Sequence, residues 1–241
     1  DPGVGTNNIT SAGSTDAYTG VYTQTLPCQN ARVTLRALLE GPYRAETGLM
    51  VDSLRVLGIL PLTEPYSAQG FAITGEGTTT PAVMAVAGTD AVVDWVLIEL
   101  RSDANASIVV ERRAALIQRD GDVTAPDGTS PVGFCAPDGN YMVVLRHRNH
   151  LGVATATHQS LSGTPTLIDL TLVSTPVFGT DPRHEVNGVW TLWQGNVVPN
   201  TTASYTGPAN DRDPVLLRVG STTPNNTVQV HVFRPIPLNG I

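Results

Sequence analysis

Glycine and proline divide this chain into short segments, and this division is the strongest constraint on its fold. The 241 residues include 23 glycines and 18 prolines, and the segments between them are rich in threonine and valine with apolar residues at alternate positions. Such alternation is typical of strands buried on one face, whereas glycine and proline occur in the turns between them. Helical patterns are nearly absent. The sequence therefore predicts an all-β fold.

The clearest strand is 94–101, which places Trp95 and Glu99 on one face and Ile98 on the other. We expect it to be a central strand and to form a hairpin with 108–118. Two Asp-Gly dipeptides mark residues 120–128 as turns. The other predicted strands are 31–39, 132–135, 141–148 and 166–173, with 132–135 and 141–148 paired as a hairpin, while 49–58 is a short helix or a wrapped loop. About seven to nine strands spaced in this way predict an antiparallel β-sandwich over residues 25–175.

Three further regions flank the predicted sandwich. Residues 1–24 have almost no aliphatic side chains and are expected to form an extended polar arm. Residues 176–226 form a second, small β-rich region after a boundary near Thr175. Residues 227–241 contain a strictly alternating strand and a tail, and a lone strand of this kind must add to the edge of some sheet. The residues expected to join protomers there are Thr227, Val228, Val230, Val232 and Phe233.

All 14 basic residues are arginine, and the absence of lysine excludes several kinds of chemistry. Schiff-base catalysis, a phosphate-binding P-loop and Lys–Asn isopeptide crosslinks all require lysine. The formal net charge of −7 opposes binding to nucleic acid phosphates. No apolar run reaches 18 residues, so no membrane-spanning segment is expected.

The two cysteines, Cys28 and Cys135, are too far apart for a CxxC redox or zinc motif. In a secreted chain they would form a disulfide, which in the chain-entropy model contributes roughly 4–5 kcal/mol. Two buried free thiols are the alternative interpretation.

No catalytic site is predicted. His147 and His150 are expected to point to opposite faces of a strand and to have no acidic third ligand nearby in sequence. Glu99, Glu111 and Asp169 lie on predicted strands and are interpreted as solvent-facing residues. HExxH and GxSxG motifs are absent.

The order of strands and turns, with 138–141 (Asp-Gly-Asn-Tyr) leading into a strand and Trp95 on a neighbouring one, resembles prealbumin-like sandwiches in bacterial surface proteins. A longer set of phrases resembles a module of large secreted surface proteins of Bacteroidetes, often labelled haemagglutinin-like or adhesin-like and exported by the type IX pathway. The phrases are ALLEGPY (37–43), LPLTEPY (60–66), VDWVLIELR (93–101), ALIQRDGDV (115–123), RHRNHLGV (146–153) and YTGPANDRDPVLLRVG (205–220). This resemblance implies an extracellular, cell-surface or secreted location.

Members of that family usually carry a calcium-type acidic loop just before the Tyr-Thr-Gly sequence, but residues 195–202 of this chain contain no carboxylate. Asn210, Asp211 and Asp213 follow and form the remaining candidate calcium site. The alternative is that these carboxylates are solvated and paired with Arg212. No other cofactor is expected.

Two functions follow from these observations. The first is a non-enzymatic structural subunit of a cell-surface assembly, possibly a filament, whose partners are copies of itself joined through the arm or the terminal strand. The second is an adhesin or carbohydrate-binding module that stacks surface glycans on an exposed aromatic residue such as Tyr66, Trp190 or Trp193, with Trp193 as the candidate. The alternative interpretation is that both tryptophans anchor the core of the small second region.

Overall fold

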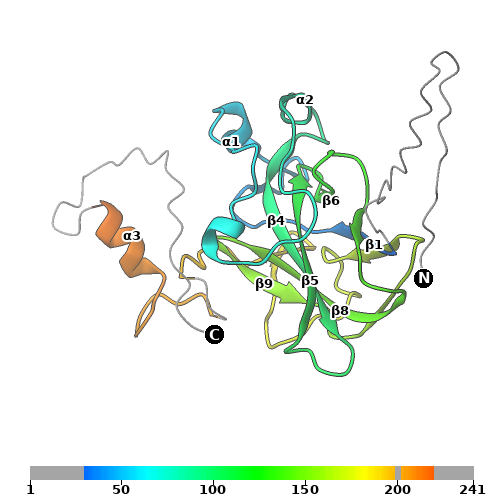
Figure 1. Cartoon of the computed structure of the whole chain (residues 1–241). Coiled ribbons are helices and arrows are strands. Elements are labelled where there is room, and N and C mark those ends of the chain that lie inside the picture. Colours follow the sequence, from blue (N-terminus) through cyan, green and yellow to red (C-terminus); the bar gives the residue numbers. More distant parts are fainter. Residues whose placement is uncertain (1–29, 199–201, 220–241) are drawn as a thin grey trace, which may run out of the picture.

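The computed structural model describes residues 30–198 and 202–219 and shows an all-β, sandwich-like fold (Figure 1). The strands are β1 (Ala31–Arg36), β2 (Tyr43–Arg44), β3 (Leu49–Met50), β4 (Val92–Ser102), β5 (Val109–Gln118), β6 (Asp122–Thr124), β7 (Val132–Phe134), β8 (Gly139–His147), β9 (His150–Ala154), β10 (Gln159–Leu161), β11 (Thr166–Asp169), β12 (His184–Val186) and β13 (Val189–Thr191). The helices are α1 (Ser53–Val56), the 3-10 helix η1 (Ser67–Gln69), α2 (Pro81–Met84) and α3 (Arg212–Val219). No helix among these described elements is long and apolar enough to cross a lipid bilayer.

Nine strands form one large sheet in the order β10-β8-β4-β5-β6-β1-β11, with β7 also paired to β1 and β9 to β8. Its two ends approach each other, because the backbone N–H of Arg32 in β1 donates to Ser162 O (3.0 Å) and the Thr166 hydroxyl in β11 donates to Ser160 O (2.8 Å). The sheet therefore curls around an interior. The predicted all-β sandwich class is confirmed, and β4 is central as expected, paired to β5 and β8.

One predicted pairing was wrong, and two pairings were not foreseen. β7 pairs with β1 and not with β8, so the expected hairpin of 132–135 with 141–148 does not form. β11 runs parallel to β1, a pairing that alternation within one segment cannot reveal. The two Asp-Gly dipeptides of 120–128 lie in turns or bends, as predicted, but the short strand β6 forms between them and pairs with both β1 and β5.

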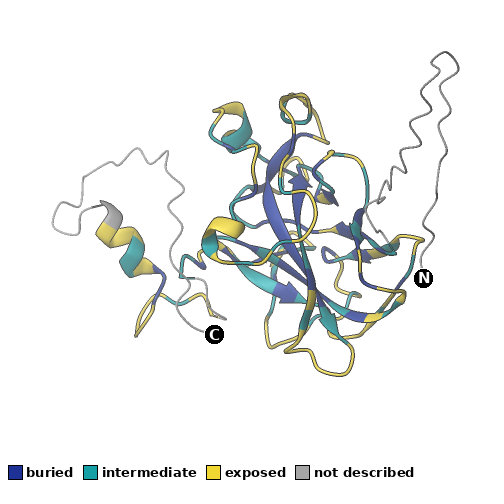
Figure 2. Cartoon of the chain, viewed as in Figure 1, coloured by how far each residue is buried: buried dark blue, intermediate teal, exposed yellow. Residues whose placement is uncertain are grey.

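The main core fills the inside of the curled sheet (Figure 2). Side chains that alternate along each strand point inward, so β4 contributes Val96, Ile98 and Leu100, while β8 contributes Val143 and Leu145. All five are at most 2% exposed. Their burial follows from the period-two pattern of the sequence.

A second apolar cluster covers part of the outer face of β4 and β5. Trp95, which is fully buried, lies there beneath the segment 54–84. The Tyr66 hydroxyl donates to Trp95 O (2.8 Å), and the Trp95 indole N–H donates to Pro61 O (2.8 Å). Residues 49–58, predicted to be a short helix or a loop, form β3 and the short helix α1.

The chain beyond the predicted boundary near Thr175 packs back onto the main sheet. Leu192 is fully buried in the main core, where its N–H donates to Leu38 O (2.8 Å) and its carbonyl accepts from Glu40 N–H (3.1 Å). β12 and β13 form a small separate sheet. The division of the chain into 25–175 and 176–226 stays a prediction, and these contacts cross it.

Candidate functional site

The outer face of the sheet is covered by another segment at one end of β4 and uncovered farther along β4 and β8. Near Trp95 it is covered by the segment 54–84, whereas farther along it is open. Alternation places Glu99 and Arg101 of β4 on this outer face, together with Met142, Val144 and Arg146 of β8. The open part of this face holds a charged cluster and, beside it, a groove.

The charged cluster consists of Glu99 and three arginines from three strands. Arg101 donates to Glu99 Oε2 through Nη2 (2.6 Å) and Nε (3.0 Å), and Arg112 Nε donates to Oε1 (2.9 Å). Arg146 Nε lies 3.2 Å from Oε1 as a further ion pair. Burial alone would raise the pKa of Glu99, but Arg146, Arg112 and Arg101 hold that pKa below its ordinary value.

Glu99 was expected to face solvent, and that interpretation was wrong, because Glu99 is fully buried. Part of the signal was present in the sequence. In the predicted hairpin, Glu99 of β4 and Arg112 of β5 lie directly opposite each other, and opposite charges at such positions attract. Arg146 comes from β8, whose pairing with β4 the sequence did not specify.

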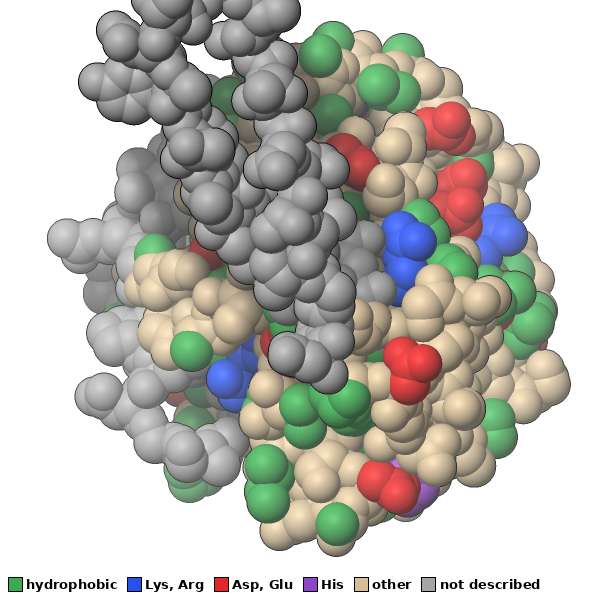
Figure 3. Space-filling model, turned by 45° about the vertical axis from the view of Figure 1, so that its right-hand side comes forward, with side chains coloured by type: hydrophobic (Ala, Val, Ile, Leu, Met, Phe, Trp, Pro, Cys, Tyr) green, Lys and Arg blue, Asp and Glu red, His purple; other side chains and the backbone are tan. Residues whose placement is uncertain are grey.

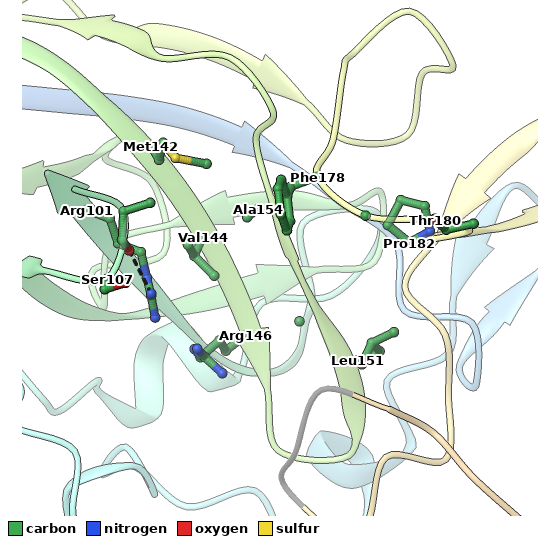
Figure 4. A pocket seen from close by; sticks show the side chains of 13 residues that line it. Arg101, Ser107, Met142, Val144, Arg146, Leu151, Ala154, Phe178, Thr180 and Pro182 are labelled. Atoms are coloured by element: carbon green, nitrogen blue, oxygen red, sulfur yellow. Dashed lines mark hydrogen bonds between the residues drawn. The ribbon is translucent and has the colours of Figure 1, made fainter. Parts of the chain in front are cut away.

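A groove of about 520 Å³ lies next to the charged cluster (Figure 4). We call it the outer groove. Its floor is apolar, its edge carries guanidinium groups, and its wall comes from the loop before β12. The residues that line it are Arg101, Ala106, Ser107, Met142, Val144, Arg146, Leu151, Gly152, Ala154, Phe178, Gly179, Thr180 and Pro182.

The wall of the outer groove is held by backbone and aromatic contacts. Phe178 N–H donates to Ala154 O (2.9 Å), which joins the wall to β9, while the Phe178 side chain remains 71% exposed. The Trp193 indole stacks on His184 with ring centroids 4.2 Å apart and donates to Asp181 O (3.0 Å). Trp193, the residue predicted to bind ligand, thus supports the loop behind the groove and does not line it. Glycan stacking by Trp193 stays a prediction.

A second polar cluster lies between β4 and the β8–β9 turn. The Nδ1 atoms of His147 and His150 are 2.9 Å apart, and His147 Nε2 lies 3.2 Å from Asp94 Oδ2. Arg148 Nη2 donates to the same oxygen (2.5 Å). The expectation that the two histidines point to opposite faces was therefore wrong, and their acidic partner Asp94 comes from β4, which is distant in sequence. β8 ends at His147 and β9 begins at His150, so the turn makes them a directly opposed pair.

The hydrogen bonds fix the state of these rings. Gly41 N–H donates to His150 Nε2 (3.3 Å), so His150 carries its proton on Nδ1 and donates toward His147. His147 then donates from Nε2 to Asp94. Burial and the neighbouring His147 lower the pKa of His150 to about 2, so this ring is neutral at physiological pH. Burial alone would raise the pKa of Asp94, but Arg148 and His147 hold it below its ordinary value.

The other acidic residues considered in the sequence are also engaged. Glu111, expected to face solvent, is 8% exposed, and it accepts from Arg113 Nε (2.7 Å), the Thr74 hydroxyl (2.9 Å) and Ala136 N–H (3.0 Å). Asp169 is half-buried and accepts from the backbone and hydroxyl of Thr171. These carboxylates brace strands and loops.

The candidate calcium residues cap and brace α3. Asp211 accepts from Val198 N–H and Ser204 N–H, each at 2.7 Å. Asn210 Oδ1 accepts from Asp213 N–H (2.9 Å), and the Asp213 carboxylate accepts from the Asn210 amide (2.8 Å). Across residues 30–198 and 202–219, no group of three His, Cys, Asp or Glu side chains is placed to hold a metal ion. Calcium binding here stays a prediction.

Several predicted residues lie outside the described part of the chain. They are Cys28, the arm 1–24, and the assembly residues Thr227, Val228, Val230, Val232 and Phe233. Cys135 follows β7 directly, and Arg113 Nη2 lies 3.3 Å from its sulfur. The Cys28–Cys135 bridge and the assembly role of the terminal strand stay predictions.

No protein-family model, curated protein or solved structure matches the chain.

Proposed function

We propose that this chain is a non-enzymatic binding module of an extracellular surface protein and that the outer groove holds its ligand. The observation that carries the proposal is the groove itself, with its apolar floor and the exposed ring of Phe178 on its wall. A volume of about 520 Å³ lies within the range of small-molecule sites. An exposed aromatic ring beside such a groove suits the apolar face of a sugar.

The lowered pKa values of the Glu99 and Asp94 carboxylates favour binding over acid–base catalysis. A general acid or base works best when its pKa lies near the working pH, and catalytic carboxyl groups are therefore tuned upward. The pKa values of Glu99 and Asp94 are instead held below their ordinary values by arginine partners. Both groups remain ionised, and Glu99 holds Arg101 and Arg146 of the groove lining by ion pairs.

Hydroxyl groups add to the suitability of the groove for carbohydrate. Ser107 and Thr180 lie among its lining residues, and a hydroxyl both donates and accepts hydrogen bonds. The floor formed by Met142 and Val144 supplies apolar contact beneath them (Figure 4). On the face shown in Figure 3, hydrophobic and charged side chains are scattered among other side chains and backbone.

A glycan array tests this function with a matched pair of variants. Phe178 and Tyr205 are exposed to nearly the same extent, 71% and 72%, but only Phe178 lines the outer groove. We expect the wild-type chain and Tyr205→Ser to bind the same glycans and Phe178→Ser to lose them at unchanged thermal stability. Absence of any glycan binding by the wild-type chain, or equal binding by both variants, contradicts the proposal.

A structural subunit is the second candidate, and β11 is the observation that favours it. Among the described strands, β11 pairs with β1 alone and ends the sheet. Leu167 on this strand and Val173 just beyond it are 67% and 74% exposed. An edge strand with exposed apolar side chains is a template for strand addition, and residues 227–233 of another protomer have the alternation to provide that strand.

Deletion of either terminus tests the structural function. We expect removal of 1–24 or 227–241 to abolish assembly, measured by light scattering and electron microscopy, while circular dichroism shows an intact β fold. A third variant is Leu167→Asp, which alters the β11 edge without shortening the chain and should also reduce assembly. Filaments that persist in all three variants would exclude strand exchange at this edge.

A further inference from the structure

The charged cluster beside the outer groove has an excess of positive charge. One carboxylate, Glu99, faces the guanidinium groups of Arg101, Arg112 and Arg146. Among the described residues that line the groove there are two arginines and no acidic side chain. This local excess stands out in a chain whose formal net charge is −7. A ligand with a negative group would balance it.

Arg146 is the arginine whose guanidinium group is available to bind a negative group. Arg101 uses Nε and Nη2 on Glu99 and donates from Nη1 to Ala106 O (2.9 Å). Arg112 lies with its guanidinium over the Phe71 ring, outside the groove lining. Arg146 has the most exposed side chain of the three, 39%, and it meets Glu99 through Nε alone. Among the described residues its two terminal nitrogens have no hydrogen-bond acceptor.

We propose that the ligand of the outer groove is an acidic sugar, whose carboxylate is bound by Arg146 and whose ring packs on Phe178. This inference rests on the proposed binding function and specifies its ligand class. The two terminal nitrogens of a guanidinium match the two oxygens of a carboxylate in a planar, charge-assisted pair. Val144 separates Arg146 from Met142 along the floor, and Phe178 is drawn on the opposite side of this floor near Ala154 (Figure 4).

The strand pairing around the groove argues against an extended peptide as the ligand. A peptide usually adds to an open strand edge through its backbone. β9 is paired to β8 on one side, and bridges from His150 to Gln194 and from Thr155 to Val177 occupy the other side. The backbone groups along both edges of β9 are therefore already paired, so the groove must recognise its ligand through side chains.

Calorimetric titration tests the inference with acidic and neutral saccharides, of which one pair, an acid and its methyl ester, differs chiefly in charge. The probes are trigalacturonic acid, its methyl ester, 3′-sialyllactose, lactose and inorganic phosphate. The variants are Arg146→Gln and, as a control, Arg36→Gln, which removes a similarly exposed arginine (46%) that does not line the groove. Arg146→Gln should fold normally because Glu99 keeps Arg101 and Arg112 as partners.

We expect at least one acidic probe to bind more tightly than its neutral counterpart, and Arg146→Gln to weaken that binding about tenfold, as the loss of one charge-assisted pair implies. Arg36→Gln should bind as the wild type does, and binding should weaken with added salt. Equal binding of acidic and neutral probes, or an unchanged Arg146→Gln, overturns the acidic-sugar inference while the binding function stands. Phosphate that binds as well as the sugars also overturns it.

Two outcomes would contradict the binding function as well. One is that no saccharide binds at all. The other is that a second copy of this chain fills the groove. In that case no saccharide binds, and Arg146→Gln lowers the mass measured by light scattering.

Discussion

Replacing Glu99 by glutamine tests whether the charged cluster holds the outer face together. Glu99 is fully buried, and its carboxylate is shared by Arg101, Arg112 and Arg146. The substitution keeps the shape of the side chain but leaves three guanidinium groups near one another without a counter-charge. Removing one partner of a fully buried ion pair costs roughly 3–5 kcal/mol. The side chains of the three arginines are 22–39% exposed, and solvent screening reduces the expected loss to about 2–3 kcal/mol.

Thermal and urea unfolding measure this loss. For a chain of this size, a loss of about 2–3 kcal/mol lowers Tm by about 4–12 °C. Glu46→Gln is the control, because Glu46 is exposed and lies outside the cluster. The difference from wild type should depend on pH with a definite sign. Since the folded-state pKa of Glu99 lies below 4.5, its stabilisation is present above that pH and is lost as the pH falls through the lowered value. Equal Tm values for the two variants, or a difference that persists in strong acid, would refute the reasoning.

Three other predictions concern the core, the histidine pair and the cysteines. Tyr66→Phe removes the hydroxyl that donates to Trp95 O and should lower the free energy of unfolding by about 1 kcal/mol, measured in urea; no change would mean that solvent replaces this bond. His150 should show no NMR titration between pH 8 and 4, because its folded-state pKa is about 2. Since the unfolded chain binds a proton there below about pH 6.5, stability should fall by up to about 1.4 kcal/mol per pH unit on acidification, and less in His150→Gln. Reducing agent should lower Tm if Cys28 and Cys135 are joined, and an unchanged Tm would favour free thiols.

Local alternation was enough to predict the centre of the fold. The sequence of β4 assigned Trp95 and Glu99 to one face and Ile98 to the other, and the structure has this arrangement. The hairpin of β4 with β5 also follows from a short turn between two alternating segments. These features depend on neighbours in the chain, and the physical rule that governs them is the two-residue period of a strand.

The rest of the fold depends on contacts between distant segments. β1 pairs with β11 in parallel and with β7 and β6 on its other edge, and none of these partners is its neighbour in sequence. The burial of Glu99 has the same origin, because Arg146 arrives from β8. His147 and His150 were misplaced for a different reason, since a tight turn between them converts sequence neighbours into cross-strand partners.

The outer groove is assembled from the β4–β5 hairpin, β8, β9 and the loop before β12. Phe178 lies in a segment with no strand pattern, and the aromatic residue predicted from the sequence to stack on a ligand is Trp193. The structure assigns the two residues different positions, with Phe178 on the groove and Trp193 stacked behind it on His184. The sequence does not show which of these two aromatic side chains reaches the surface of the groove.

The most direct test of the account is an NMR titration of the ¹⁵N-labelled full chain with trigalacturonic acid. The account predicts amide shift changes concentrated at Arg146, Gly152 and Phe178, with little change at Tyr205 on the distant α3 side. Shift changes centred on Trp193 without Phe178 would contradict the claim that the outer groove is the binding site, and no change at any amide at millimolar ligand would contradict binding of this acidic sugar there.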